Sequence, residues 1–322
     1  MTGSAAECYK RPKGEPVDSQ DRKPRRIAAC AACGGIRLSP YRKGAFRAAD
    51  LTPEDFKITD SRYGITWDLS ACLDCGHIFA DPCPSPELVN ATYGAIEDPL
   101  YDAEAAGRGK NFLRILRRLE KLLPAKGRLM DVGAATGILL HLARERGWMP
   151  DGVEPSAWAV DHARRTYGIS LKQGAFETVP LEPESCDAVT MVDFIEHTAQ
   201  PFEALEQAAR ILRPDGILCL VTPDIRSLAA RLAGRRWWHF RPAHLAYFSR
   251  HGLDALFRRT GFAPVLRKRY AWTFSARYLL SRLAWTRGLL RNPRTASFFE
   301  KIPIQLALGD SFEIYARRIP SA

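Results

Sequence analysis

Two Cys-x-x-Cys pairs, each followed by glycine, could bind a metal ion. Cys30 pairs with Cys33, and Cys72 pairs with Cys75. Four thiolates can surround Zn²⁺ as a tetrahedron, and the glycine lets each turn point backbone amides at the sulfurs. A site of four thiolates has no open coordination position, so we expect a structural zinc rather than a catalytic one. The alternative is a set of four reduced structural thiols.

A glycine turn between a predicted strand and a predicted helix could bind a nucleoside. The apolar residues 129–132 lead into Gly133 and Gly137, and the apolar run 138–143 follows. Further along the chain, Glu154 ends a second short strand. Gly133 allows the backbone to approach a ligand closely, and the carboxylate can accept hydrogen bonds from ribose hydroxyls. The alternative is an ordinary turn in an α/β sheet.

Acidic and histidine residues follow a predicted buried strand at 187–192. Asp193, Glu196 and His197 come directly after it. Side chains of these types can remove the proton from an oxygen nucleophile. For His197, a structural role as the cap of the following helix is an equal alternative.

The segment 235–248 mixes histidine, arginine and aromatic residues. His239 and His244 are further candidates for a general base. The surrounding aromatic and arginine side chains suit an aromatic or sugar substrate that carries an anionic group. The alternative is that the aromatic side chains pack this segment against the core.

Alternating strands and helices must position these groups. The nearly continuous apolar run 187–192 is typical of a parallel strand that is buried on both faces. Further strands are predicted at 169–171, 217–221 and 310–317, helices at 202–212 and 250–260, and strands within the cysteine-containing unit at 56–58 and 63–67.

The glycine turn resembles motif I of the class I S-adenosylmethionine (SAM) methyltransferases. It has the form Asp-x-Gly-x-x-x-Gly, with alanine where many members have a middle glycine. The resemblance covers about residues 110–320. It implies an α/β, Rossmann-like class I methyltransferase sheet, mostly parallel with the last strand antiparallel. It also implies SAM contacts from Asp131, Gly133, Ala135, Gly137, Glu154, Ala175, Phe176, Val192 and Asp193.

Two shorter segments resemble particular groups of methyltransferases. Residues 72–84 resemble the zinc ribbon of methyltransferases from sugar, polysaccharide and secondary-metabolite clusters. Residues 192–197 resemble ubiquinone-biosynthesis O-methyltransferases, in which two acids and a histidine can bind Mg²⁺. Asp193 has a shorter side chain than the acid of that group, so we expect no Mg²⁺ here. The candidate catalytic residues are Glu196, His197, His239 and His244.

The chain of 322 residues suggests one large domain and one small one. The large domain carries the glycine turn, and the small one carries the cysteines. The predicted division is a disordered basic arm at 1–27, a zinc ribbon at 28–85, a linker with helices at 86–125, and a SAM-binding domain at 126–322 that includes a substrate lid at about 226–250 and a helical insertion at about 271–309.

The net charge of +11 is concentrated near the C-terminus. Between Arg226 and Arg294 there are 16 lysines and arginines and a single acid. Such a stripe can meet nucleic acid, anionic lipid or a phosphorylated substrate, or can simply be solvated. Basic amphipathic residues at 271–290 leave peripheral membrane contact, core packing and dimerisation open. The oligomeric state stays open.

The sequence shows neither an N-terminal apolar leader nor an apolar run long enough to span a membrane. We therefore expect a cytoplasmic protein without disulfides. The predicted function is SAM-dependent methylation of a small molecule, glycan or lipid-linked intermediate. Oxygen is the expected acceptor atom. The alternatives are an RNA methyltransferase that grips phosphates with its ribbon and basic stripe, and a non-catalytic zinc-ribbon adaptor with a SAM-binding fold.

Overall fold

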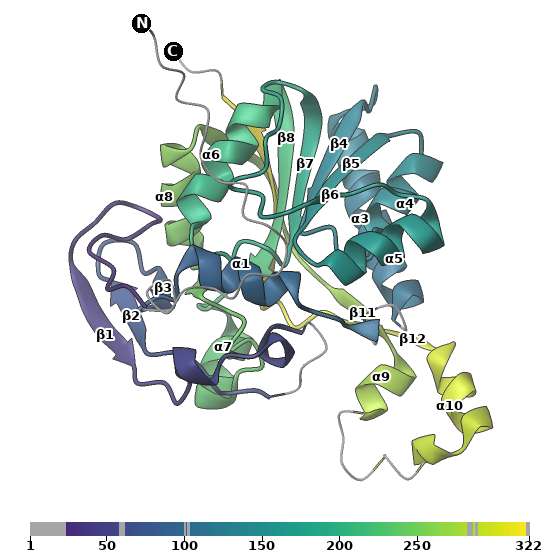
Figure 1. Cartoon of the computed structure of the whole chain (residues 1–322), viewed down its shortest axis with the longest axis horizontal. Coiled ribbons are helices and arrows are strands. Elements are labelled where there is room, and N and C mark those ends of the chain that lie inside the picture. The colour runs from purple at the N-terminus through teal and green to yellow at the C-terminus, as the bar shows by residue number, and fades with distance from the viewer. Residues whose placement is uncertain are drawn as a thin grey trace, which may run out of the picture.

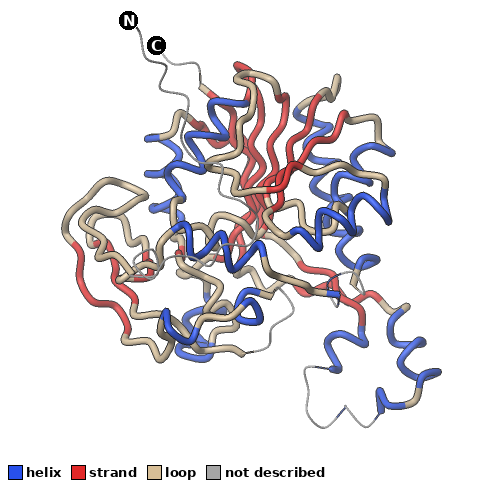
Figure 2. The backbone as a smooth tube through the Cα atoms, in the orientation of Figure 1, coloured by secondary structure: helices blue, strands red, loops and turns tan. Residues whose placement is uncertain are grey.

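A seven-stranded sheet forms the centre of the computed structural model (Figures 1 and 2). Its strand order is β10-β13-β8-β7-β4-β5-β6. The strands are β4 (Arg128–Val132), β5 (Met149–Glu154), β6 (Lys172–Gln173), β7 (Cys186–Val192), β8 (Leu212–Pro223), β10 (Phe262–Arg269) and β13 (Ser311–Arg318). The structure describes residues 24–57, 62–99, 101, 104–281, 286 and 289–319, so nearly all of the predicted basic arm lies outside it.

The direction of the strands confirms the predicted sheet. Strands β4 to β8 pair in parallel, whereas β13 runs antiparallel to both of its neighbours, β8 and β10. The central strands β4 and β7 are almost fully buried, as their continuous apolar sequences require. The sheet is therefore the Rossmann-like class I methyltransferase sheet, with the last strand antiparallel.

Helices cover both faces of this sheet. Apolar side chains of α6 (Pro201–Ile211) and α8 (Arg250–Arg259) join one buried cluster. Those of α3 (Ala105–Leu122), α4 (Ile138–Glu145) and α5 (Ala157–Tyr167) join a second cluster. Figure 1 shows the two groups of helices on opposite sides of the strands. The loops at the carboxyl ends of the parallel strands are left free to form a site.

The cysteine-containing unit forms a separate antiparallel sheet. Its strands are β1 (Leu38–Arg42), β2 (Leu69–Cys72), β3 (Ile78–Ala80) and β9 (Ala246–Tyr247). Strand β9 comes from the predicted lid, after α7 (Leu228–Ala233) and the 3₁₀ turn η3 (Gly234–Arg236). The N-terminal unit and the lid are therefore joined by backbone hydrogen bonds.

The strands predicted at 56–58 and 63–67 are wrong. Phe56 ends a 3₁₀ helix, η2 (Pro53–Phe56), and 63–67 contains no strand. Another 3₁₀ turn, η1 (Ala48–Asp50), precedes it. Thr52 and Asp55 form a capping box around Pro53, which starts a helical turn and overrides the apolar alternation. Part of 56–58 lies outside the described residues.

Two other predicted boundaries also shift. The short third strand lies at 172–173 rather than at 169–171, and β8 begins at Leu212 rather than at Ile217. Residues 213–216, between the predicted helix and the predicted strand, form an irregularity within β8, where Asp215 has a φ of 65° and the register with β7 shifts. A turn-like sequence is here absorbed as a bulge.

The insertion before β13 is only partly helical. It contains α9 (Ala276–Ser281), the 3₁₀ turn η5 (Leu289–Arg291) and α10 (Pro293–Glu300). Strands β11 (Trp272–Ser275) and β12 (Pro303–Leu306) pair at its base. The aromatic and β-branched residues of β11 favour a strand, and the two strands enclose the helices. Within the described residues, no helix is both long enough and apolar enough to cross a membrane.

Candidate cofactor pocket and cysteine cluster

A pocket of about 940 Å³, including the part open to solvent, lies at the carboxyl ends of β4, β5 and β7. Helix α1 (Pro86–Gly94) begins at the Ser85 cap and covers the pocket with Val89, Asn90 and Tyr93. Of the predicted site residues, Gly133, Ala135, Glu154, Ala175, Phe176, Asp193 and His197 line it. Asp131, Gly137, Val192, Glu196, His239 and His244 do not.

The glycine turn is held in left-handed backbone conformations. Gly133, Ala135 and Gly137 have φ values of 69°, 46° and 81°. A Cβ at Gly133 would lie 3.2 Å from the Phe194 ring, and one at Gly137 would lie 3.0 Å from the Ala163 methyl carbon. Alanine at position 135 adopts a conformation that L-residues seldom take, which makes the turn a candidate functional element.

Asp131 precedes the turn and is hydrogen-bonded to the neighbouring strand β7. Its carboxyl is buried, and Oδ1 accepts a hydrogen bond of 2.6 Å from the Thr190 hydroxyl. Burial raises the pKa of Asp131 to about 7, and the bond from Thr190 opposes that rise. The predicted direct SAM contact by Asp131 is therefore not visible in the pocket lining.

Glu154 faces the pocket and also closes the turn. Its Oε2 accepts from the Ala135 amide at 2.8 Å, and its Oε1 accepts from the Ser156 amide at 2.9 Å. Burial raises the pKa of Glu154 to about 7, and these two amides oppose the rise. Each carboxylate oxygen has a second lone pair, so both can still accept a ligand hydroxyl.

Residues 174–177 form the opposite wall of the pocket. Phe176 is buried, and its ring meets Phe194 edge-on with the ring centroids 6.2 Å apart. The Gln207 side chain donates to the Val179 carbonyl at 3.2 Å, which ties this loop to α6. The result is an apolar slot next to the polar glycine turn, an arrangement that suits a nucleoside base.

Asp193 and His197 line the side of the pocket that follows β7. Asp193 has a φ of 51°, and burial raises the pKa of its carboxyl to about 7. His197 Nδ1 lies 2.6 Å from the Tyr93 hydroxyl and 3.0 Å from the Ala243 carbonyl. A carbonyl can only accept, so this arrangement favours a proton on Nδ1 and a lone pair on Nε2. Burial lowers the pKa of His197 to about 3, which keeps the ring neutral.

The other three predicted catalytic residues lie near His197 but outside the pocket lining. Glu196 Oε2 accepts from the Thr222 hydroxyl at 2.9 Å, and burial raises the pKa of Glu196. The His244 ring crosses that of His197 at 89°, with the centroids 4.6 Å apart. His239 Nε2 lies 3.3 Å from Asp310 Oδ2. These side chains can position His197, but none of them lines the pocket.

The ligand atoms of Glu196, His197 and His244 lie within 4.8 Å of one another and could hold a metal ion. Asp193, which the resemblance places among Mg²⁺ ligands, is not part of this group. Oxygen ligands suit Mg²⁺, whereas this group is dominated by imidazole. Its donors therefore differ from the two acids and one histidine that can bind Mg²⁺ in the resembling O-methyltransferases.

Sequence reasoning missed several residues of the pocket. Tyr93, Asp98 and Tyr101 line it from the segment interpreted as a linker, and Phe56 lines it from η2. The Arg108 guanidinium lies 3.8 Å over the Tyr101 ring, and its charge opposes the rise that burial causes in the pKa of Asp193. The Ser-Pro start of a helix at 85–86 is a signal that could have pointed to α1, but nothing local shows what that helix covers.

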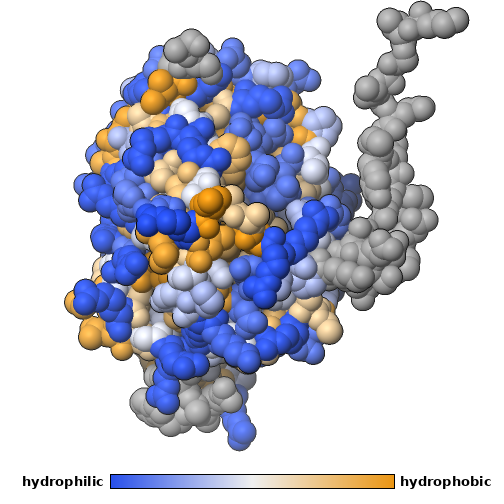
Figure 3. All heavy atoms as spheres, turned by 90° about the vertical axis from the view of Figure 1, so that its left-hand side faces the viewer, coloured by the Kyte–Doolittle hydropathy of each residue, from blue (hydrophilic) through white to orange (hydrophobic). Residues whose placement is uncertain are grey.

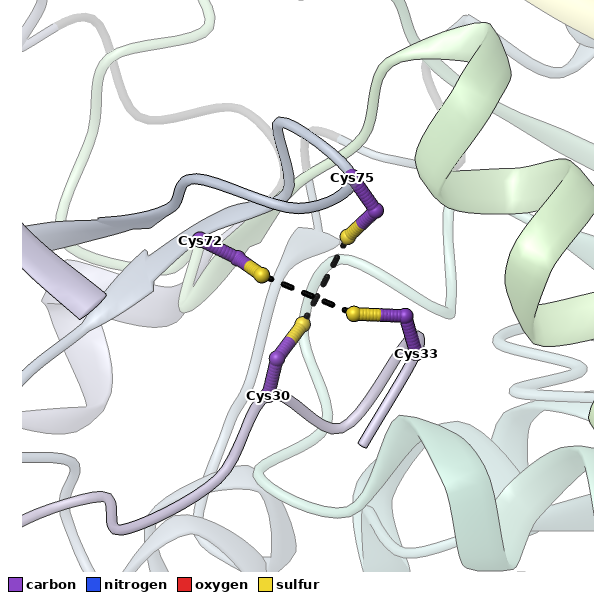
Figure 4. A group of neighbouring side chains, drawn as sticks. All are labelled: Cys30, Cys33, Cys72 and Cys75. Carbon is purple, nitrogen blue, oxygen red and sulfur yellow. Dashed lines mark hydrogen bonds between the residues drawn. The ribbon is translucent and has the colours of Figure 1, made fainter. Parts of the chain in front are cut away.

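The four predicted metal ligands converge between the two Cys-x-x-Cys turns, as Figure 4 shows. The Sγ atoms of Cys30 and Cys75 lie 3.6 Å apart, and those of Cys33 and Cys72 lie 3.5 Å apart. The glycine after each pair, Gly34 or Gly76, has a positive φ. The Gly35 amide points at Cys33 Sγ. The backbone therefore turns around the sulfurs as predicted.

His77 lies beside this cluster. Its Nδ1 is 3.5 Å from Cys30 Sγ, and its ring stacks on Phe248 at a centroid distance of 4.6 Å. The group of four neighbouring ligand atoms consists of the cysteines alone, so His77 is not part of it. His77 instead links the cluster to the lid.

Residues 104–266, half of the chain, match the family model described as a methyltransferase domain. An uncharacterized methyltransferase of Mycobacterium tuberculosis is 37% identical over 105 residues, which are 32% of this chain and 43% of that protein. The chain thus spans about two fifths of the length of this relative. A ubiquinone biosynthesis O-methyltransferase of Cereibacter sphaeroides is 26% identical over 51% of this chain and 74% of its own.

Among solved structures, a geranyl diphosphate C-methyltransferase of Streptomyces coelicolor is 16% identical, with a TM-score of 0.42. The match covers 60% of this chain and 71% of that one. The predicted family rests instead on the matched domain, which includes the glycine turn, the acidic end of β5 and the loop after β7. The chain belongs to the methyltransferase domain family.

Proposed function

We propose that the protein transfers a methyl group from SAM to a hydroxyl group. The observation that carries the proposal is the pocket at the carboxyl ends of β4, β5 and β7, in which Glu154 closes the glycine turn and faces the ligand space. The turn, the buried carboxylate and the apolar slot at Phe176 fit the amino-acid, ribose and adenine parts of SAM, respectively. When bound, SAM supplies an electrophilic methyl group on a sulfonium.

The residues on the other side of the pocket position the acceptor. Asp193 carries a carboxyl whose pKa of about 7 suits a group that takes up a proton near neutral pH. His197 is neutral and is fixed by Tyr93 and the Ala243 carbonyl, so its ring is held in one orientation and can position the acceptor by contact. Asp193 would take up the proton of the acceptor hydroxyl while the C–O bond forms and the methyl–sulfur bond of SAM breaks, with S-adenosylhomocysteine as the leaving group.

The acceptor class remains the one inferred from the sequence: a small molecule, a glycan or a lipid-linked intermediate. The acceptor side combines Tyr93 and Phe56 with the polar Asp193 and His197. An alcohol or phenol on an apolar body would match this mixed lining. The carboxylate, which can take up the hydroxyl proton, supports the proposal of methylation at oxygen.

Two measurements on the full chain test the proposal. Calorimetry with SAM and with S-adenosylhomocysteine should show one site. Transfer of labelled methyl from SAM, screened against phenols, sugars and lipid extracts, should identify an acceptor. Absence of SAM binding by the folded protein would contradict the proposal and favour the non-catalytic adaptor.

Three histidine variants separate pocket residues from those behind them. His197→Ala should lower the rate by about 100-fold with little change in SAM affinity, because it removes a group that contacts the acceptor. His239→Ala and His244→Ala should reduce the rate less, through the position of His197. Equal rates for wild type and His197→Ala would exclude His197 from the reaction.

We also propose that the cysteine cluster binds one structural zinc ion. A tetrahedron with Zn–S distances of about 2.3 Å places its sulfurs about 3.8 Å apart, close to the 3.6 and 3.5 Å separations of the two pairs. The zinc would hold the two Cys-x-x-Cys turns together through Cys30, Cys33, Cys72 and Cys75. Metal analysis of the purified protein should give about one zinc per chain, and a metal-free, fully folded protein would contradict the assignment.

A further inference from the structure

We propose that the surface formed by α7 and η3 docks on an anionic lipid membrane. This docking surface consists of Leu228, Arg231, Leu232, Arg235 and Arg236. It lies next to the N-terminal unit, below the central sheet in Figure 1. Its two leucines project into solvent, and arginines follow them along the chain.

Both leucine side chains of the docking surface are largely exposed to solvent. The exposed fractions are 68% for Leu228 and 79% for Leu232, and the two residues lie one helical turn apart. The buried residue of the helix is Ala230, so α7 packs through a small side chain and presents its large ones outward. A convex pair of leucines of this kind can enter the interface of a bilayer.

Apolar exposure alone does not identify a partner. The face in Figure 3 also carries small hydrophobic patches between hydrophilic residues, as most protein surfaces do. Charge makes the difference at α7. The segment 225–253 contains six arginines and no acid. Arg226, Arg231, Arg235 and Arg236 are all exposed around the leucines.

The flanking acids do not cancel this charge. Asp224 is buried and pairs with Arg269 at 2.6 Å. Asp254 pairs with Arg267 and lies 4.0 Å from Arg250, which is not part of the docking surface. Arginines around protruding leucines are complementary to anionic headgroups around acyl chains. RNA would use the arginines but would leave the leucines in water, so the membrane is the partner that accounts for both.

The docking surface is connected to the pocket through the chain that follows it. Residues 237–245 run from η3 to β9 and supply the Ala243 carbonyl that contacts His197. The Arg241 side chain donates to the Lys57 carbonyl at the base of η2. A membrane below α7 would therefore lie beside the acceptor side of the pocket. That the acceptor is lipid-linked rests on the proposed function, whereas the docking itself does not.

Flotation with lipid vesicles tests the docking without SAM or acceptor. The full chain should float with phosphatidylcholine vesicles that contain phosphatidylglycerol and should remain behind with phosphatidylcholine alone. Leu228→Ser with Leu232→Ser should weaken binding by at least tenfold. Ile36→Ser is the matched control, because Ile36 is 78% exposed on the N-terminal unit and should have no role.

Two double arginine variants distinguish contact of the docking surface with the vesicle from a general attraction between the basic protein and anionic lipid. Arg231→Ala with Arg236→Ala should weaken vesicle binding by about 25-fold, at about fivefold for each arginine. Arg164→Ala with Arg165→Ala removes the same charge from α5 and should change binding by less than threefold. Thermal unfolding of each variant should match wild type, because all of these side chains are exposed.

Three results would overturn the proposal: no flotation of wild type, equal binding by the leucine variant and the Ile36 control, or tighter binding to RNA than to vesicles at the same salt. SAM affinity, measured by calorimetry on the same samples, reports on the proposed function separately. Intact SAM binding without flotation would reject only the membrane surface. Flotation without SAM binding would reject only the methyltransferase activity.

Discussion

The two sides of the pocket are built in different ways. The donor side consists of the glycine turn, Glu154 and the 174–177 loop, which follow neighbouring strands of one sheet. The acceptor side joins α1, η2, the loop after β7 and the segment 237–245, which lie far apart in the sequence. The first side depends on the sheet, and the second depends on how separate units pack together.

Because of this difference, a substitution at one place in the molecule should affect mainly one side of the pocket. On the donor side, Glu154 bonds to amides at positions 135 and 156, so the central sheet fixes it directly. On the acceptor side, Phe56 packs edge-on against Tyr93 at 4.8 Å, and Tyr93 contacts His197. The N-terminal unit, which contains the cysteine cluster, is therefore connected to His197 through Phe56 and Tyr93.

Loss of the proposed zinc should have the largest effect, and this effect should be on the acceptor side. Structural zinc binding is worth roughly 10 kcal/mol, as much as the stability of a typical domain. In Cys72→Ala, we expect the N-terminal unit to unfold, the rate to become undetectable, and part of the SAM affinity to survive. Zinc content, thermal unfolding and calorimetry measure these three quantities.

Cys83→Ala is the matched control for the metal. Cys83 is buried in the same unit but lies outside the cluster of four sulfurs. It should keep its zinc and lose no more than about 2 kcal/mol of stability. Equal zinc content in the two variants would show that Cys72 is not a ligand. Equal loss of SAM affinity and rate in Cys72→Ala would show that the two sides are not independent.

Glu154→Ala should have the next largest effect and should fall on the donor side. It removes a predicted acceptor for the ribose and leaves the amides of Ala135 and Ser156 without partners. An unsatisfied buried amide costs about 1–3 kcal/mol, so SAM affinity should fall by about 100-fold. Calorimetry measures the change. Glu145→Ala on α4 is the control, because that acid is exposed and should leave SAM affinity unchanged.

The sequence predicts the donor side well because its signals are local. The glycine turn, Glu154 and the apolar strands each follow from residues close together in the chain, and the sheet order then brings them to one edge. Even here, motif membership does not decide contact. Asp131 is hydrogen-bonded to Thr190 on β7, and Gly137 belongs to the turn, but neither residue lines the pocket.

The acceptor side could not be predicted in the same way. The contact of Tyr93 with His197 spans 104 residues, and no local pattern marks it. Strand β9 is two residues long and is recognisable only through its pairing with β3. In the cysteine-containing unit, the capping box at Thr52 turned a predicted strand into η2, which places Phe56 in the pocket.

The pH dependence of the rate tests the role of Asp193. The pKa of this carboxyl is raised to about 7 by burial. Below that pH the carboxyl carries a proton and cannot accept another, so the rate at saturating SAM should rise about tenfold per pH unit and level off above pH 7. Asp193→Asn should lower the rate and remove this slope. Asparagine tolerates the left-handed conformation at φ 51°, so the loop should keep its shape.

A pH slope that persists in Asp193→Asn would assign the proton to another group. Glu154 also has a pKa raised to about 7, but its protonation acts on SAM binding. Measurement at saturating SAM therefore separates the two carboxyls. If the slope appears only below saturation, the donor side controls the pH dependence, and Asp193 has a positioning role.

The smallest expected effect is that of Tyr93→Phe, which removes only the hydroxyl that contacts His197 at 2.6 Å. One neutral hydrogen bond contributes about 1 kcal/mol, so kcat should fall about fivefold. The ring still packs against Phe56, which keeps α1 in place and leaves the SAM affinity unchanged. Tyr41→Phe, at an exposed tyrosine of β1, is the control. A loss of SAM affinity without a change in kcat would move Tyr93 to the donor side, and the division of the pocket at α1 would then have to be redrawn.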